Sequence, residues 1–106
     1  MRQINVRELK ERLDRKQPTY LVDVRQEWEH QVASLPDQIL IPLDQLADRI
    51  DEVSAPEGAL IVTYCHHGIR SLNAVAILNQ AGIDAASLAG GIDMWSLQID
   101  PRVPRY

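Results

Sequence analysis

The sequence is poor in cysteine, phenylalanine and lysine. Its 106 residues include one cysteine, Cys65, no phenylalanine, and only two lysines among eleven basic residues. A single cysteine excludes an internal disulfide framework and a zinc cage built from cysteines. It leaves two interpretations of Cys65, a buried packing residue or a reactive thiol. Because the other basic residues are arginines, a bound anion is expected to meet a guanidinium group.

Long apolar runs and runs of one charge are absent as well. The longest apolar stretch, residues 59–62, is far short of the roughly 20 residues that span a bilayer, and residues 1–8 lack a signal-peptide core. Eleven basic residues against fifteen acidic ones give a net charge of −4 without a basic run. We therefore expect a cytoplasmic protein whose partners are neither nucleic acids nor membranes.

The composition fits a globular protein with one domain. Hydrophobic residues make up 45% of the chain and charged residues 25%, close to the average of globular proteins. The length is enough for one core and not for two. We expect a single domain over residues 1–106, with a core from about 4 to 97 and a short tail over 98–106.

Apolar periodicity predicts helices that alternate with short strands. Helices are expected over residues 6–13, 26–32, 43–53, 71–81 and 92–97, and strands over 20–24, 39–41, 59–64 and 84–88. Asn5 and Glu8 form a capping-box pattern, and Gly82 is expected to end its helix in a left-handed conformation. This alternation predicts a three-layer α/β fold, with a mostly parallel sheet covered by helices on both faces. Ligands of such sheets bind at the carboxyl ends of strands, where Cys65 lies.

The segment that follows the strongest predicted strand favours an anion and a reactive thiol. It reads Cys65, His66, His67, Gly68, Ile69, Arg70 and Ser71. Backbone N–H groups in such a turn, together with the start of the next helix, form an anion-binding nest to which Arg70 adds a positive charge. Such surroundings lower the pKa of a thiol, so Cys65 is expected to act as a nucleophile. An inert thiol at the end of a buried strand is the alternative.

The two neighbouring histidines are not expected to bind a metal ion. His66 and His67 are adjacent in sequence and cannot easily aim at one ion together, and His30 is the only other imidazole. We expect both to line the mouth of a pocket and to select or steer the substrate. Nothing in the sequence indicates a cofactor.

Three segments resemble the signatures of rhodanese domains and occur in the order typical of that family. They are Leu21-Val22-Asp23-Val24-Arg25 followed by Trp28-Glu29-His30 and Ile41-Pro42-Leu43, then the loop from Tyr64 to Ser71, and then Leu88 to Trp95, which is similar to the closing L-x-G-G-x-x-x-W signature. The likeness extends over residues 4–95. The tail, residues 100–106, is similar to the end of rhodanese domains fused to enzymes that activate ubiquitin-like sulfur carriers.

The resemblance implies a five-stranded parallel sheet and a sulfurtransferase activity. Cys65 would take a sulfane sulfur from a small donor such as thiosulfate, hold it as a persulfide, and pass it to cyanide, a thiol or a partner protein. The backbone of residues 66–70 would form the cradle, and Arg70 would hold the donor's oxyanion or order the loop. Asp23 and Arg25 match positions near the pocket wall, or form an ion pair that fixes the loop. With no second cysteine, the persulfide would need an outside acceptor.

One segment departs from the family pattern. Rhodanese domains often carry Gly-His-Ile-Pro-Gly before the third strand, where this chain has Ala33-Ser34-Leu35-Pro36-Asp37. The missing glycines put the local turn in doubt.

Two other functions fit the same residues. Cysteine phosphatases resemble the loop but place five residues between cysteine and arginine, whereas four separate Cys65 from Arg70. The shorter loop makes a narrower nest, which suits one sulfur better than a phosphoryl group. A non-catalytic binding module of the same fold would usually lack the nucleophile, and Cys65 is present.

Overall fold

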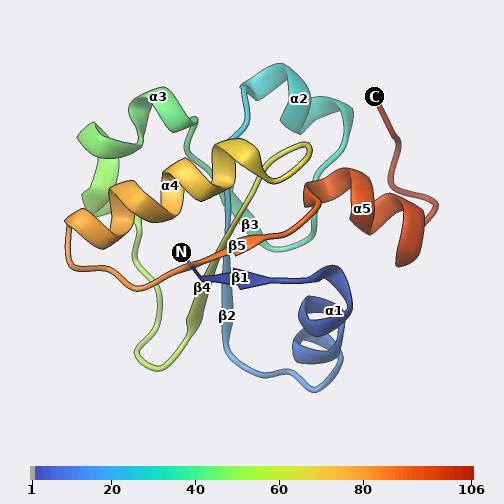
Figure 1. Ribbon diagram of the computed structural model, residues 1–106, viewed down its shortest axis with the longest axis horizontal. Helices are drawn as coiled ribbons and strands as arrows, with labels where there is room; N and C mark the ends of the chain where they lie inside the picture. Colours follow the sequence, from blue (N-terminus) through green and yellow to red (C-terminus); the bar gives the residue numbers. More distant parts are fainter. Residues whose placement is uncertain (1) are drawn as a thin grey trace.

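The chain forms three layers around a twisted, fully parallel sheet, as Figure 1 shows for the computed structural model, which describes residues 2–106. The five strands are β1 (Gln3–Ile4), β2 (Thr19–Asp23), β3 (Gln38–Leu40), β4 (Leu60–Tyr64) and β5 (Ala86–Leu88). Their order is β1-β5-β4-β2-β3, and all neighbouring pairs run parallel. The α/β fold predicted from the alternation of helices and strands is confirmed.

Helices cover both faces of the sheet. They are α1 (Val6–Asp14), α2 (Glu27–Val32), α3 (Leu43–Leu46), the 3₁₀ helix η1 (Ala47–Glu52), α4 (Ile69–Gln80) and α5 (Gly91–Gln98). Helices α1 and α5 pack together on one face, and α3, η1 and α4 on the other (Figure 1). Each face has its own apolar cluster, one around Leu9, Tyr64 and Trp95 and one around Val22 and Val75. Parallel strands covered on both sides explain the short continuous apolar runs.

Local capping signals in the sequence act as predicted. The Asn5 side chain accepts a hydrogen bond from the Glu8 N–H at 2.8 Å, and the Glu8 carboxylate accepts one from the Asn5 N–H at 3.2 Å. This reciprocal pair satisfies donors that the first turn of α1 would otherwise leave free. Gly82 follows α4 with φ +80°, a conformation that costs glycine little.

Three elements differ from the predictions. Strand β1 was not expected, because two residues are too few to show a periodicity, and its pairing with β5 is a long-range contact. The helix expected over residues 43–53 breaks into α3 and η1, with Arg49 outside helical geometry at φ −120° and ψ 24°. Helix α4 begins at Ile69, two residues before its predicted start.

The segment that departs from the family pattern bends at Pro36 and Asp37. Asp37 adopts φ 51°, the left-handed region that glycine favours, at the position of the family's second glycine. A short polar side chain tolerates this region better than most. Leu35 is buried, and its N–H donates to the Tyr64 hydroxyl at 3.2 Å. Strand β3 starts directly after Asp37, so the chain enters this strand without either glycine.

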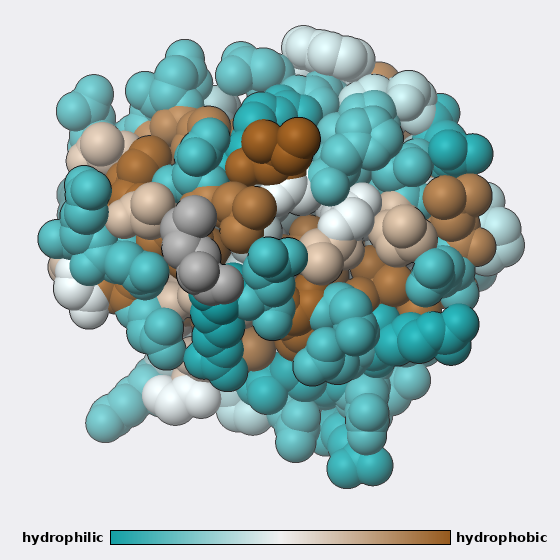
Figure 2. Space-filling model, in the orientation of Figure 1, coloured by the Kyte–Doolittle hydropathy of each residue, from teal (hydrophilic) through white to brown (hydrophobic). Residues whose placement is uncertain are grey.

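Contact with a membrane depends on the length of the helices and on the polarity of the surface. Within residues 2–106 no helix is both long and apolar enough to cross a bilayer. The face shown in Figure 2 is mostly hydrophilic, with hydrophobic side chains lying between the polar ones.

Candidate active site

Cys65 lies directly after β4, at the carboxyl end of the sheet. Its thiol is free, and only 1% of the residue is exposed. It forms part of a small pocket of about 170 Å³ lined by Cys65, His66, His67, Ile69 and Arg70. Five of the seven predicted loop residues therefore line one pocket. The thiol therefore borders a pocket although almost none of the residue is exposed.

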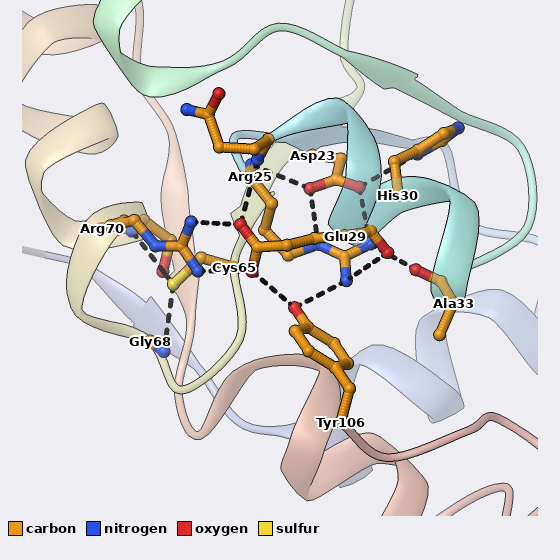
Figure 3. A network of polar contacts seen from close by, with 11 residues as sticks. Asp23, Arg25, Glu29, His30, Ala33, Cys65, Gly68, Arg70 and Tyr106 are labelled. Atoms are coloured by element: carbon orange, nitrogen blue, oxygen red, sulfur yellow. Dashed lines mark hydrogen bonds and ion pairs between the residues drawn. The ribbon is translucent and has the colours of Figure 1, made fainter.

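Backbone N–H groups of the loop converge on the cysteine sulfur. The N–H of Gly68 donates to Cys65 Sγ at 3.1 Å (Figure 3). The N–H of Ser71 donates to the same sulfur at 3.4 Å, and Sγ lies 3.5 Å from Ser71 Oγ. Gly68 adopts φ +100°, which lets the chain turn sharply into α4. Donors aimed at one sulfur stabilise negative charge on it.

Buried hydroxyl contacts hold Ser71 in place. Ser71 Oγ and Ser87 Oγ lie 2.7 Å apart, and the Thr63 hydroxyl donates to the Ser71 carbonyl at 2.9 Å. Both contacts link α4 to the ends of β4 and β5. The first turn of α4 is thereby fixed against the sheet beneath the thiol.

The start of α5 packs directly on the backbone of the cysteine loop. The N–H of Ile92 donates to the Cys65 carbonyl at 2.9 Å, and that of Asp93 to the His66 carbonyl at 3.1 Å. A Cβ atom on Gly91 would collide with both of these carbonyl oxygens. Gly91 also has φ +62°. The second glycine of the closing Gly90-Gly91 motif is thus explained by a close approach of two backbones.

Arg70 is bound by a glutamate from α2. Its Nη1 and Nη2 donate to Glu29 Oε1 and Oε2 at 2.6 and 2.8 Å, a bidentate ion pair (Figure 3). This hydrogen bonding lowers the pKa of Glu29 to about 2, against an opposing effect of burial, and raises the pKa of Arg70. The guanidinium borders the pocket, but both of its terminal nitrogens already have a partner.

Asp23 and Arg25 form a second ion pair, which is fully buried. Arg25 Nε and Nη2 donate to Asp23 Oδ1 and Oδ2 at 2.9 and 2.7 Å, and both side chains are 0% exposed. Burial disfavours the charged guanidinium, yet hydrogen bonds to Asp23 and Tyr106 outweigh it and raise the pKa of Arg25. Within residues 2–106 neither residue hydrogen-bonds to Cys65; Arg25 is connected to Glu29, the partner of Arg70, by a hydrogen bond to the Glu29 carbonyl and through the Tyr106 hydroxyl.

The two histidines stack at the rim of the pocket beside a residue of the tail. The rings of His66 and His67 lie 3.9 Å apart, and those of His66 and Tyr106 also 3.9 Å at an interplanar angle of 10°. Burial, followed by the neighbouring His67, lowers the pKa of His66. Within residues 2–106 no three His, Cys, Asp or Glu side chains are grouped so that they could hold a metal ion.

Glu29 and Tyr106 are the residues of this site that the sequence did not predict. Glu29 lies in a segment that resembles the first rhodanese signature, but nothing in the pattern indicates that it pairs with a residue 41 positions away. Tyr106 belongs to an irregular tail, whose contacts follow from no periodicity. Both become visible only once α2, the loop and the tail are placed together.

Comparison with known proteins gives the same family over most of the chain. The model of the Rhodanese-like domain matches residues 5–98. The adenylyltransferase and sulfurtransferase MOCS3 of Arabidopsis thaliana is 30% identical over 97% of this chain, which corresponds to 25% of the relative. The chain therefore spans about a quarter of the length of the curated relatives it matches.

Solved structures show the same fold. A rhodanese-like domain protein from Staphylococcus aureus is 30% identical with a TM-score of 0.83, over 100% of this chain and 99% of that one. An NAD-dependent persulfide reductase from A. fulgidus is 37% identical with a TM-score of 0.70, over 90% of this chain and 16% of that one. With sequence, fold and loop in agreement, the chain belongs to the rhodanese-like domain family.

Proposed function

We propose that this chain is a sulfurtransferase, in which Cys65 carries a sulfane sulfur as a persulfide. One observation carries the proposal: Cys65 Sγ borders a pocket at the carboxyl end of the sheet and accepts hydrogen bonds from the N–H groups of Gly68 and Ser71. An inert core thiol needs neither the pocket nor the convergent donors. A thiolate nucleophile needs both.

The chemistry proceeds in two displacements at sulfur. With thiosulfate as donor, the Cys65 thiolate attacks the sulfane sulfur, a bond to Sγ forms, and sulfite leaves with the electron pair of the broken sulfur–sulfur bond. Cyanide or an acceptor thiolate then attacks the outer sulfur of the persulfide, and the Cys65 thiolate leaves. The N–H groups of Gly68 and Ser71 stabilise the thiolate at the start and end of this cycle.

The residues around the pocket have separate roles in this proposal. His66, His67 and Ile69 shape the entrance, and Gly68 and Ser71 supply the donors. Arg70 provides the positive charge toward an anionic donor, while its pairing with Glu29 orders the loop. The buried Asp23–Arg25 pair supports α2 and does not touch the reacting atoms.

The arrangement of Arg70 favours sulfur transfer over phosphatase activity. A cysteine phosphatase needs a guanidinium free to form a fork on the phosphoryl oxygens. Here both terminal nitrogens of Arg70 are directed at Glu29. For sulfur transfer the cysteine loop has to enclose only the transferred sulfur of the persulfide, not the three oxygens of a phosphoryl group.

The acceptor is a small molecule or a group presented by another protein. The matching region of the Arabidopsis relative belongs to a protein described as an adenylyltransferase and sulfurtransferase, and the A. fulgidus relative is described as a persulfide reductase. A small pocket offers little surface for a specific small-molecule site, which favours an acceptor group presented by another protein. A panel of sulfur donors and acceptors, assayed with the wild type and with Cys65→Ser, identifies the pair that this chain uses.

Steady-state turnover tests the proposal. Wild-type protein with thiosulfate and cyanide is expected to form thiocyanate, and Cys65→Ser is expected to reduce the rate to background. Asp14→Asn, a change in an exposed ion pair on α1, is the control for handling and folding. Hydrolysis of an aryl phosphate that depends on Cys65 would favour a phosphatase. Absence of any sulfur transfer from a folded wild-type protein, with thiol as well as cyanide acceptors, would favour a non-catalytic binding module.

A further inference from the structure

Tyr106 lies at the rim of the site, beside the pocket-lining His66, although it belongs to the tail beyond α5. Its ring stacks on His66 and meets the edge of Trp28, with centroids 5.8 Å apart. Its hydroxyl donates to Glu29 Oε2 at 2.7 Å and accepts from Arg25 Nη1 at 2.9 Å (Figure 3). One hydroxyl therefore connects both ion pairs beside the cysteine loop.

The tail is anchored so that this contact is maintained. Arg105 Nε donates to Asp93 Oδ1 at 2.8 Å, and Val103 packs against the apolar cluster between α1, α5 and the sheet. Burial raises the pKa of Tyr106 to about 12. The phenol thus keeps its proton at neutral pH and remains a donor to Glu29.

The carboxylate of Glu29 is shared among several donors. Oε1 accepts from Arg70 Nη1 and from the N–H of Gln26 at 3.1 Å, whereas Oε2 accepts from Arg70 Nη2 and the Tyr106 hydroxyl. Each additional donor binds part of the negative charge of the Glu29 carboxylate, so less of that charge neutralises Arg70. The Tyr106 hydroxyl therefore affects how strongly Glu29 neutralises the guanidinium that borders the pocket.

We propose that Tyr106 is a positioning residue, which acts through Glu29 to set how much of the positive charge of Arg70 an anionic sulfur donor meets. The inference rests on the proposed function and deepens it, because it concerns the preference of the same site for anionic donors. Without the hydroxyl, Glu29 neutralises Arg70 more fully, and an anion near Cys65 is attracted less. Tyr106 itself does not touch the reacting sulfur.

Two alkylating reagents measure this charge without any sulfur transfer. Iodoacetate is anionic and iodoacetamide is neutral, and both react with a thiolate, so the ratio of their rates reports the local charge at the thiol. Cys65 is the only cysteine, so all thiol alkylation reports this site. Tyr106→Phe keeps the ring and removes the hydroxyl, and we expect the ratio of iodoacetate to iodoacetamide rates to fall about threefold.

The steady-state constants for thiosulfate give a second measurement. Because the change weakens attraction of the donor, its KM is expected to rise about threefold in Tyr106→Phe, with kcat within about twofold of wild type. Arg102→Ala is the matched control, since Arg102 is an exposed tail residue whose side chain bonds only to Asp100. It is expected to match wild type in both measurements. Circular dichroism confirms that each variant is folded.

A double-mutant cycle tests whether the effect passes through Glu29. Glu29→Gln removes the negative charge, so the rate ratio is expected to rise, opposite to the effect of Tyr106→Phe. In the Glu29→Gln background, Tyr106→Phe is expected to change the ratio by less than about 1.5-fold. A full threefold fall in that background, or an unchanged ratio in the single variant, would overturn the inference while leaving sulfur transfer intact. If the wild type transfers no sulfur but the ratios behave as expected, the proposed function fails alone.

Discussion

Two ion pairs of different burial meet beside the cysteine loop. The Asp23–Arg25 pair is completely buried, whereas Arg70 in the Glu29–Arg70 pair keeps 35% of its side chain exposed. Asp23 also accepts from the Tyr64 hydroxyl at 3.2 Å and contacts His30 Nδ1 at 3.1 Å. A buried carboxylate with this many partners is a structural centre, because each partner would lose its acceptor together with it.

Asp23→Asn is expected to destabilise the protein strongly. The substitution leaves the buried Arg25 guanidinium without a countercharge, which typically costs about 3–5 kcal/mol. Urea unfolding measures the change in free energy. Asp14→Asn removes one partner of an exposed pair with Lys10 and is expected to leave the unfolding midpoint nearly unchanged. If both variants unfold at the same urea concentration as wild type, the buried pair does not hold this region together.

At the scale of secondary-structure elements, helix α5 packs closely on the cysteine loop. Gly91 brings the start of α5 against the carbonyls of Cys65 and His66, and the N–H groups of Ile92 and Asp93 satisfy those carbonyls. The loop is thus shaped on one side by α4 and on the other by α5. A change at this contact should affect the thiol even though it lies on another element.

Gly91→Ala compared with Gly82→Ala separates backbone strain from close approach. Both glycines have positive φ, +62° and +80°, so both variants incur the cost of about 1–2 kcal/mol for a left-handed residue. A Cβ on Gly82 meets nothing within 4 Å, whereas one on Gly91 collides with the loop. Gly91→Ala is expected to lose about 1–3 kcal/mol more, by urea unfolding, and to slow alkylation of Cys65 by iodoacetamide.

Equal behaviour of Gly91→Ala and Gly82→Ala would contradict this expectation. Equal losses of stability in the two variants, with equal alkylation rates, would mean that α5 does not shape the cysteine loop.

Elements were predictable where the signal is local. The capping box of α1, the apolar strands and Gly82 at the end of α4 all follow from neighbouring residues, and each is present. Strand β1 was missed because its two residues become a strand only by pairing with β5. The break at Arg49 was missed since the apolar spacing of residues 43–53 fits one continuous helix. Both misses reflect tertiary context that a local pattern does not contain.

Across the whole molecule, the site joins segments that are far apart in sequence. The hydrogen bonds from Arg25 to Tyr106 and from Arg70 to Glu29 bridge 81 and 41 positions. The family motifs pointed to Cys65 and its loop, because those residues are contiguous. They did not reveal that Arg70 is held by Glu29, or that the tail covers His66, since such pairings depend on the packing of the complete chain.

This network predicts how stability depends on pH. Hydrogen bonding to Arg70 lowers the pKa of Glu29 from 4.5 to about 2. As the pH falls, Glu29 therefore takes up a proton in the unfolded state at a higher pH than in the folded state. Its contribution to the free energy of unfolding is complete above pH 4.5 and is lost as the pH falls toward 2. The difference in unfolding free energy between wild type and Glu29→Gln is expected to be constant from pH 7 to 6 and to shrink below 4.5. A difference that stays constant down to pH 3 would contradict the pairing.

The central claim is that Cys65 carries sulfur, and intact-protein mass spectrometry tests it most directly. After incubation with thiosulfate and removal of small molecules, the wild type is expected to gain the mass of one sulfur atom, and this gain should disappear on addition of cyanide. Cys65→Ser is expected to show no gain. A folded wild-type protein that gains no sulfur from thiosulfate or from a small persulfide donor, or a Cys65→Ser variant that gains as much as wild type, would contradict the account.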